Sequence, residues 1–238
     1  MLNDNSDWTY YQQPHLPRSC ADILHQFGHV ENLQNGAYWI SVDTVGPMKV
    51  YCDMTTEEGG WTLVNNIVLK MPKSFVFILE NNWQAISNYT TGQIALTASA
   101  LGDLKKKMPF NQLRFHCFKK IPGRTFHVVT VKNTLGDDVV KYFTAQTDSF
   151  PKSCGSFYSL PDDNSMLSKS CRQWKDGNWS AVQPVLPDEK FRLVSHVAYV
   201  QSKYHWISMP PRWECDDYYP RYLDIVLPSG DYWKLFVR

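Results

Sequence analysis

The sequence has almost no net charge and no long apolar run. Lysine and arginine number 24 against 23 aspartate and glutamate, a formal charge of +1, so no field of one sign draws in nucleic acid or an acidic membrane. The longest apolar stretch, residues 75–79, is far shorter than the ~20 residues that a helix needs to cross a bilayer. The densest basic run, residues 105–107, is typical of a solvated helix face. The sequence therefore predicts neither a nucleic-acid partner nor a membrane span.

Motifs of catalysis are also missing. No Gly-x-Ser-x-Gly, P-loop or His-Glu-x-x-His pattern occurs. His25 and His29 have the spacing of zinc ligands on a helix, but Gly28 lies between them and no third ligand is near, which favours a surface pair. His116 adjoins Cys117, and a cysteine with a histidine can form a catalytic dyad. Neighbours in a strand face opposite sides of a sheet, however, so these two side chains are not expected to meet. We therefore expect a protein that is not an enzyme.

The cysteines point to an oxidising compartment. There are six, an even number, and none forms a Cys-x-x-Cys pair. Two sequons, at Asn88 and Asn178, are potential N-glycosylation sites in turn-rich sequence. Residues 1–7 lack the regions of a signal peptide, so secretion needs a leader upstream of them. The sequence predicts a secreted, disulfide-bonded glycoprotein with these cysteines: Cys20, Cys52, Cys117, Cys154, Cys171 and Cys215.

Periodicity predicts more strands than helices, with no alternation of the two. We therefore expect the α+β class with an antiparallel sheet, and an ordered loop region over residues 149–190. Asp137-Asp138, after Gly136, is expected to form a turn. The predicted helices are 20–28 and 97–108, and the predicted strands are 37–41, 48–52, 61–64, 112–117, 124–131, 191–200 and 232–237.

Four blocks in a fixed order carry a family resemblance. They are Ser-Cys-Ala-Asp-Ile-Leu at 19–24, Asn-Gly-Ala-Tyr-Trp-Ile at 35–40, Val-Tyr-Cys-Asp-Met-Thr at 50–55 and Gly-Gly-Trp-Thr-Leu-Val at 59–64. Together they resemble the opening of a fibrinogen C-terminal domain, and residues 230–238 resemble its terminal strand, which returns to the central sheet.

The resemblance implies a layout and a function. The layout is a leader or linker over residues 1–18 and one domain over 19–238, with a small N-terminal disulfide subdomain at 19–64, a central antiparallel sheet and a loop-rich ligand region. The implied function is that of a secreted, non-catalytic and lectin-like module that recognises glycans or other extracellular proteins.

The resemblance also implies a Cys20–Cys52 bridge, which would stabilise the fold by roughly 3.5 kcal/mol in the chain-entropy model. The other four cysteines allow several pairings. Cys154 and Cys171 are close enough in sequence for a local loop, which leaves Cys117–Cys215 by elimination.

Ligand sites of the family are altered here. The nearest stretch to its Asp-x-Asp calcium loop is Asp162-Asp163-Asn164, a candidate calcium site whose alternative is a turn with an Asx cap. Candidate ligand-binding aromatics accompany acidic residues, with burial in the core as the alternative for each. They are Trp174, Trp179, Trp213, Tyr218 and Tyr219.

A second function stays open. The run at residues 207–217 is similar in texture to secreted fibrinogen-like proteins of cnidarians, which include coral skeletal matrix proteins. This favours a structural role in extracellular matrix or in biomineralization, without a discrete ligand. A formal charge of +1 lacks the acidic excess of a direct calcium-carbonate binder.

Overall fold

The structure is a computed structural model. It divides into two compact units, residues 1–62 with Arg238 and residues 63–237, and each is described by itself. No helix among the described residues is long and apolar enough to span a membrane. The structure describes residues 16–30, 32–42, 45–70, 78–121, 123–180, 189–195, 197–210, 212–217 and 230–238.

The first unit places a helix beside a hairpin. The N-cap of its helix is Ser19, whose side chain accepts a hydrogen bond from the backbone of Asp22. A disulfide, Cys20–Cys52, ties this helix to the second strand, and Trp61 is fully buried. The elements are α1 (Cys20–Phe27), β1 (Gly36–Ser41), β2 (Pro47–Asp53), η3 (Thr56–Glu58) and the first two residues of β3 (Trp61–Val68).

The close approach of the backbone before Trp61 explains why residue 59 is a glycine. Gly59 has φ 76° and ψ −162°, a conformation that is essentially confined to glycine. A Cβ atom there would lie 2.2 Å from the carbonyl oxygen of Met54. The chain therefore passes close to its own backbone at this point, and this approach allows the Trp61 indole to donate to the Thr56 carbonyl at 2.9 Å.

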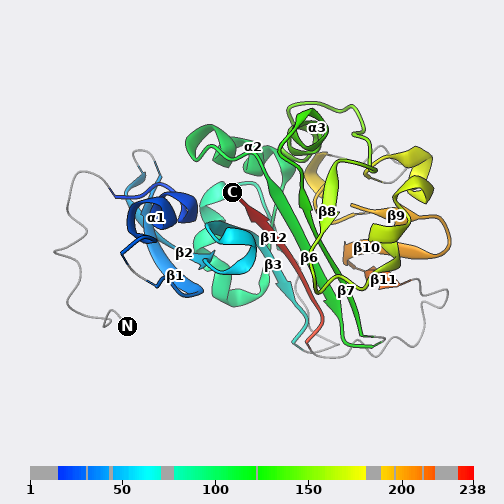
Figure 1. Ribbon diagram of the computed structural model, residues 1–238, viewed down its shortest axis with the longest axis horizontal. Helices are drawn as coiled ribbons and strands as arrows, with labels where there is room; N and C mark the ends of the chain where they lie inside the picture. The colour runs from blue at the N-terminus through cyan, green and yellow to red at the C-terminus, as the bar shows by residue number, and fades with distance from the viewer. Residues whose placement is uncertain are drawn as a thin grey trace. The chain divides into compact units, whose positions relative to one another are not determined.

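The second unit is built on a large sheet. Its order is β3-β12-β6-β7-β8, with β5 paired to β3 and β4 parallel to β5. Figure 1 shows β12, in red, between β3 and β6. The sheet elements are β4 (Ile78–Glu80), β5 (Gln93–Leu96), β6 (Leu113–Lys119), β7 (Arg124–Thr130), β8 (Phe157–Ser159) and β12 (Tyr232–Val237).

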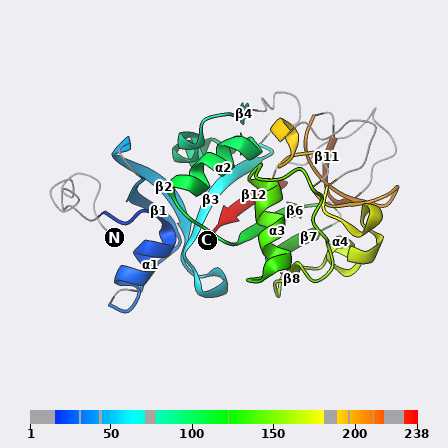
Figure 2. The ribbon, with the colours of Figure 1, turned by 90° about the horizontal axis from the view of Figure 1, so that it is seen from above.

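A second, smaller sheet and several helices complete this unit. The smaller sheet has the order β11-β10-β9. Figure 2 shows α2 and α3 side by side. The elements are η4 (Trp83–Thr91), α2 (Ala98–Lys107), α3 (Thr134–Phe143), α4 (Met166–Lys169), η5 (Cys171–Gln173), η6 (Lys175–Gly177), η7 (Glu189–Phe191), β9 (Tyr199–Val200), β10 (Tyr204–Met209) and β11 (Arg212–Asp217).

The core of the second unit is aromatic. Phe115 on β6 packs against Phe143, Trp179 and Trp206, with ring centroids 5.0 to 5.8 Å apart. A disulfide between Cys117 and Cys215 joins β6 to β11 beside them. The fold class is thus α+β with a largely antiparallel sheet, as predicted.

Two local predictions are wrong. Of the described residues in the range 191–200, only Tyr199–Val200 form a strand, because the buried Arg192 donates to the carbonyls of Tyr142 and Thr147 and holds its segment in turns. The Asp137-Asp138 pair lies inside α3 and not in a turn. The Asn133 side chain caps this helix by accepting from the N–H groups of its first turn.

Candidate functional site

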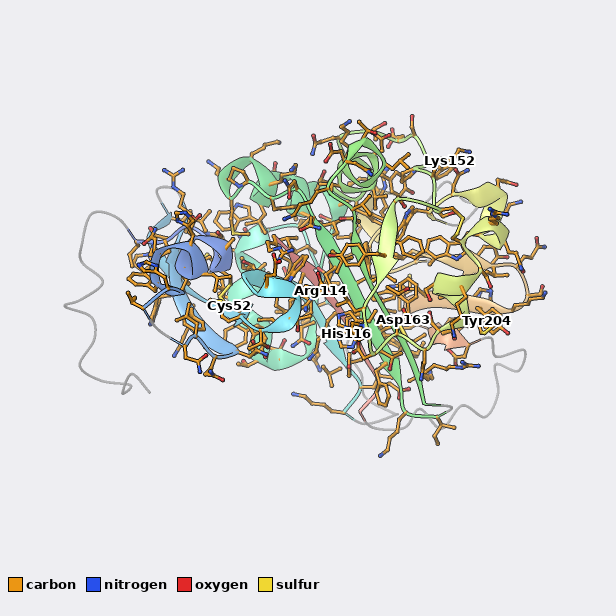
Figure 3. The ribbon with its side chains drawn as sticks, in the orientation of Figure 1. Cys52, Arg114, His116, Lys152, Asp163 and Tyr204 are labelled. Atoms are coloured by element: carbon orange, nitrogen blue, oxygen red, sulfur yellow. A yellow bond between two sulfur atoms is a disulfide. The ribbon has the colours of Figure 1, made fainter. Side chains whose placement is uncertain are left out.

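Strands β6, β7 and β12 carry polar side chains on the face opposite the aromatic core. Alternation along β6 sends Phe115 and Cys117 inward, so His116 lies on the other face. The register pairs His116 with His127 on β7 and with Lys234 on β12. Figure 3 shows His116 next to Arg114 along the central strands, with Asp163 beside them.

Four side chains meet on this face, and we call them the histidine cluster: His116, His127, Asp162 and Tyr232. The two imidazole rings are stacked, with centroids 3.7 Å apart and planes 7° from parallel. Asp162 Oδ1 lies 2.7 Å from His127 Nδ1, and Asp162 Oδ2 lies 3.9 Å from His116 Nε2. The Tyr232 hydroxyl is 2.9 Å from His116 Nε2. The cluster therefore connects β6 to its two neighbours, β7 and β12, and to the loop after β8.

The loop after β8 is held against β7 by its own polar side chains. Asp163 Oδ2 accepts a hydrogen bond from the backbone N–H of His127 at 2.8 Å. Asn164 accepts one from the backbone of Thr125 at 2.8 Å and donates to the carbonyl of Gly123 at 3.0 Å. These bonds fix the loop and so bring the exposed carboxylate of Asp162 to the histidines.

The three residues of the predicted calcium site, Asp162, Asp163 and Asn164, have different partners within the protein. The other oxygen of Asp163, Oδ1, accepts from the N–H and hydroxyl of Ser165, both at 3.0 Å, and from the Ser168 hydroxyl at 2.7 Å. The side chains of Asp163 and Asn164 are thus hydrogen-bonded to the protein, whereas Asp162 contacts His127. The alternative interpretation, an Asx cap, describes the geometry of Asp163.

The acidic pair at the end of β11 also has partners within the protein. Asp216 is buried and accepts hydrogen bonds from the N–H groups of Met166 and Leu167, and its burial raises the pKa of this carboxyl. Asp217 accepts a bond from the Cys215 N–H at 2.7 Å and lies 3.7 Å from the buried Lys119 ammonium. Asp216 therefore caps backbone N–H groups of α4, and Asp217 balances the charge of Lys119.

The predicted ligand-binding tryptophans are core residues, so that prediction is wrong. Trp174 and Trp179 are 1% and 0% exposed, and Trp213 is 7% exposed. The Trp174 indole donates to the Leu167 carbonyl and the Trp179 indole to the Ser156 hydroxyl, which satisfies both N–H groups inside the unit. Tyr218 and Tyr219 lie outside the described residues.

The structure contains three disulfides, Cys20–Cys52, Cys117–Cys215 and Cys154–Cys171, and none of the six cysteines is free. These are the pairs named from the sequence. Asn88 is exposed, whereas Asn178 is half-buried next to the buried Trp179.

Burial sets the protonation of the cluster. Desolvation lowers the pKa of His127, and the nearby Asp162 opposes that shift. Desolvation together with Asp162 raises the pKa of Tyr232 to about 12. At neutral pH the site therefore holds a neutral His127 ring and a Tyr232 phenol that keeps its proton.

His127 and Tyr232 were not singled out from the sequence. A signal was available, because the segments 112–117 and 124–131 were both predicted as strands of an antiparallel sheet, and each contains one histidine. What was missing was the register, which decides whether the two rings face each other.

The sequence comparisons with known proteins match only part of the chain. Residues 16–99 match the family model described as fibrinogen beta and gamma chains, C-terminal globular domain. A relative, "Fibrinogen-like protein A" of Apostichopus parvimensis, is 48% identical over 50 residues, which are 21% of this chain and 17% of the relative. The chain thus matches about a sixth of that protein's length.

Two solved structures are similar over most of their length. The fibrinogen-like globe domain of human ANGPTL2 has 15% identity and a TM-score of 0.38, with 93% of this chain and 98% of that chain covered. The fibrinogen-like globe domain of human ANGPTL6 has 14% identity and a TM-score of 0.41, with 95% and 98% covered. The histidine cluster lies outside the residues that the family model matches. Residues 16–99 are thus similar in sequence to the fibrinogen C-terminal domain, in agreement with the resemblance predicted for that part of the chain.

Proposed function

We propose that this chain is an extracellular, non-catalytic binding module of the fibrinogen-related type, which recognises a glycan or a protein. The observation that carries the proposal is the fibrinogen match at residues 16–99, in a chain whose six cysteines all form disulfides. Such disulfides persist in oxidising compartments, which supports an extracellular location.

The binding surface that we propose is the half-exposed face of β6 and β12. Phe118 and Lys234 are both half-buried there, on either side of Tyr232. The rings of Phe118 and Tyr232 lie 5.7 Å apart, and the Lys234 ammonium lies 4.8 Å from the Tyr232 ring centroid. Aromatic rings beside a cationic group offer both apolar contact and hydrogen bonding, which glycan and protein ligands use.

The chemistry of this face supports binding over catalysis. Tyr232 has a pKa raised to about 12, so its phenol stays protonated and is a poor nucleophile at neutral pH. The hydroxyls of Ser165 and Ser168, which follow Asp162 in the same loop, are hydrogen-bonded to Asp163. The disulfides leave no thiol for nucleophilic attack.

Arrays of glycans and of extracellular proteins test the proposal. The oxidised chain is compared with Phe118→Ala and Lys234→Ala, and with Lys141→Ala on the exposed side of α3 as the matched control. We expect one class of ligand, with affinity reduced at least about tenfold by the first two variants and unchanged by the control. Silence on both arrays, or binding that neither face variant alters, would overturn the proposal.

The alternative is a structural role in extracellular matrix or mineral. Two measurements distinguish this role from that of a binding module: immunolocalisation of the native protein, and sedimentation of the pure chain with calcium carbonate. Retention in the matrix without a soluble array ligand would favour the structural role.

A further inference from the structure

Three donor atoms of the histidine cluster converge from separate segments. One ligand atom each from His116, His127 and Asp162 lies within 4.8 Å of the other two. In tetrahedral zinc sites the metal–ligand bonds are about 2.0–2.2 Å long, which places neighbouring ligand atoms roughly 3.4 Å apart. The separations of 2.7 Å and 3.9 Å between Asp162 and the two histidines lie on either side of that value.

We propose that His116, His127 and Asp162 bind a divalent transition-metal ion, zinc being the expected one. Two imidazole nitrogens and one carboxylate oxygen form a donor set that suits zinc, whereas calcium prefers oxygen donors alone. Because the two rings are stacked nearly parallel, binding one ion requires each imidazole to tilt out of the stack toward it.

The stacking of the two imidazole rings disfavours a positive charge on both. Two imidazolium rings would repel each other at the 3.7 Å stacking distance. The ligand atom of His127 is Nδ1, which faces Asp162, so the ring proton of the metal-bound form lies on Nε2. Nε2 is buried and has no hydrogen-bond partner among the described residues, which lowers the affinity that we expect of the site.

The carboxylate is positioned in advance. Asp162 has a 55% exposed side chain, while the next two residues of its loop are hydrogen-bonded to β7. Binding a metal therefore requires little ordering of the loop, which lowers the entropic cost of the site.

The surroundings limit the strength of the site. The Tyr232 hydroxyl lies 2.9 Å from His116 Nε2, so a metal bound at that nitrogen displaces this contact. Lys234 lies over the Tyr232 ring, and Arg114 acts on His127 with the sign that lowers its pKa. Two positive groups near the donors reduce the affinity for a cation, so we expect a Kd nearer micromolar than picomolar.

The test is a zinc titration of the chelator-treated, oxidised chain, followed by calorimetry and by competition with a chromophoric chelator. We expect one zinc ion per chain. Asp162→Asn keeps the size of an exposed side chain, so it tests a ligand without threatening the fold, and His116→Gln tests a second one. Each should weaken zinc binding by about a hundredfold or more, since loss of a ligand exceeds the 10–100-fold cost of losing an outer-shell partner.

The matched control is the double variant His25→Gln, His29→Gln. Both residues are exposed and lie four apart at the end of α1, so they report adventitious binding by surface histidines. The control should retain the stoichiometric zinc. Absence of stoichiometric binding in the unaltered chain, or an affinity that drops in the control and not in Asp162→Asn, would overturn the proposal.

A second readout identifies the ligands directly. Cobalt(II) substituted for zinc should give visible absorption of a four- or five-coordinate ion, and Asp162→Asn and His116→Gln should each change or abolish that spectrum. A spectrum identical in both variants and in the unaltered chain would contradict the assignment even if zinc binds elsewhere. Neither measurement depends on a glycan or protein ligand, so the metal site and the proposed function fail independently.

Discussion

Asp163 and His127 are joined through a side chain and a backbone: Asp163 Oδ2 accepts the His127 N–H at 2.8 Å, across 36 residues of sequence. The same carboxylate accepts three further bonds from Ser165 and Ser168 at the start of α4. One side chain therefore connects β7 to the next helix and sets the position of Asp162.

This relationship predicts unequal effects for two neighbouring acids. Asp163→Ala leaves the His127 N–H without its acceptor, and we expect it to lower the free energy of unfolding by about 2–3 kcal/mol. Asp162→Asn alters an exposed group and should change it by less than about 0.5 kcal/mol. Urea denaturation at pH 7 measures both, and equal effects would contradict the role given to Asp163.

The turn before Trp61 predicts that Gly59 cannot be replaced by alanine. A Cβ atom at Gly59 meets the Met54 backbone, whereas Gly123, whose φ of 77° is almost the same, has open space around it. Positive φ disfavours alanine at both positions, and Gly59 has in addition a ψ of −162° and the clash with Met54, so Gly59→Ala should be the more destabilised variant. Thermal unfolding of the two variants gives the comparison, and equal melting temperatures would rule out the clash.

The two disulfides of the second unit should differ in their effect on stability. Cys117–Cys215 spans a sequence separation of 98 and Cys154–Cys171 one of 17. In the chain-entropy model a 100-residue loop contributes about 4.7 kcal/mol and a 15-residue loop about 3 kcal/mol. Replacing each pair by alanine, with the other bridges intact, should show the larger loss for Cys117 and Cys215 in denaturant titrations. The reverse order would mean that native-state packing outweighs loop closure.

Asp217 predicts a pH dependence of stability. Burial raises its pKa from 3.8 to about 6, against the opposing effect of Lys119. Between pH 4 and 6 the folded chain holds a proton here that the unfolded chain has released, so this group's contribution to stability is lost as pH rises through that window.

The test is the variant Asp217→Asn, which removes the titration. Relative to the unaltered chain, its free energy of unfolding should rise between pH 4 and 7, by on the order of 2–3 kcal/mol. Asp138→Asn, on the exposed side of α3, is the control and should show no such trend. Parallel profiles for Asp217→Asn and the unaltered chain would contradict the prediction.

Expression through a eukaryotic secretory pathway should attach a glycan at Asn88. This side chain is exposed on η4. At the other sequon the Asn178 Oδ1 atom is buried, and the Ser180 hydroxyl lies 2.8 Å from the buried Tyr142 hydroxyl. Intact-mass measurement should therefore show a loss of mass on glycosidase treatment that Asn88→Gln abolishes and Asn178→Gln preserves. The opposite pattern would place the glycan at the buried sequon.

Local patterns in the sequence were sufficient for much of the fold. The helix at α1 and the strand that ends near Cys52 depend on neighbours within a few residues, and both occur as predicted. Strand propensity failed at residues 191–200 because Arg192 finds its carbonyl partners about 45 to 50 residues away. Such long-range hydrogen bonds leave no local periodicity.

The sequence by itself determined the α+β class and the fibrinogen resemblance of the N-terminal part. Both depend on residue spacing, turn residues and cysteine positions, which can be read without knowing any tertiary contact. Only the tertiary structure decided what the polar residues do. It buried Trp174 and Trp179, divided the Asp162-Asp163-Asn164 run between a loop tether and an exposed carboxylate, and set His116 against His127. The physical reason is register: one residue of slip between β6 and β7 would turn one of the two rings to the other face of the sheet.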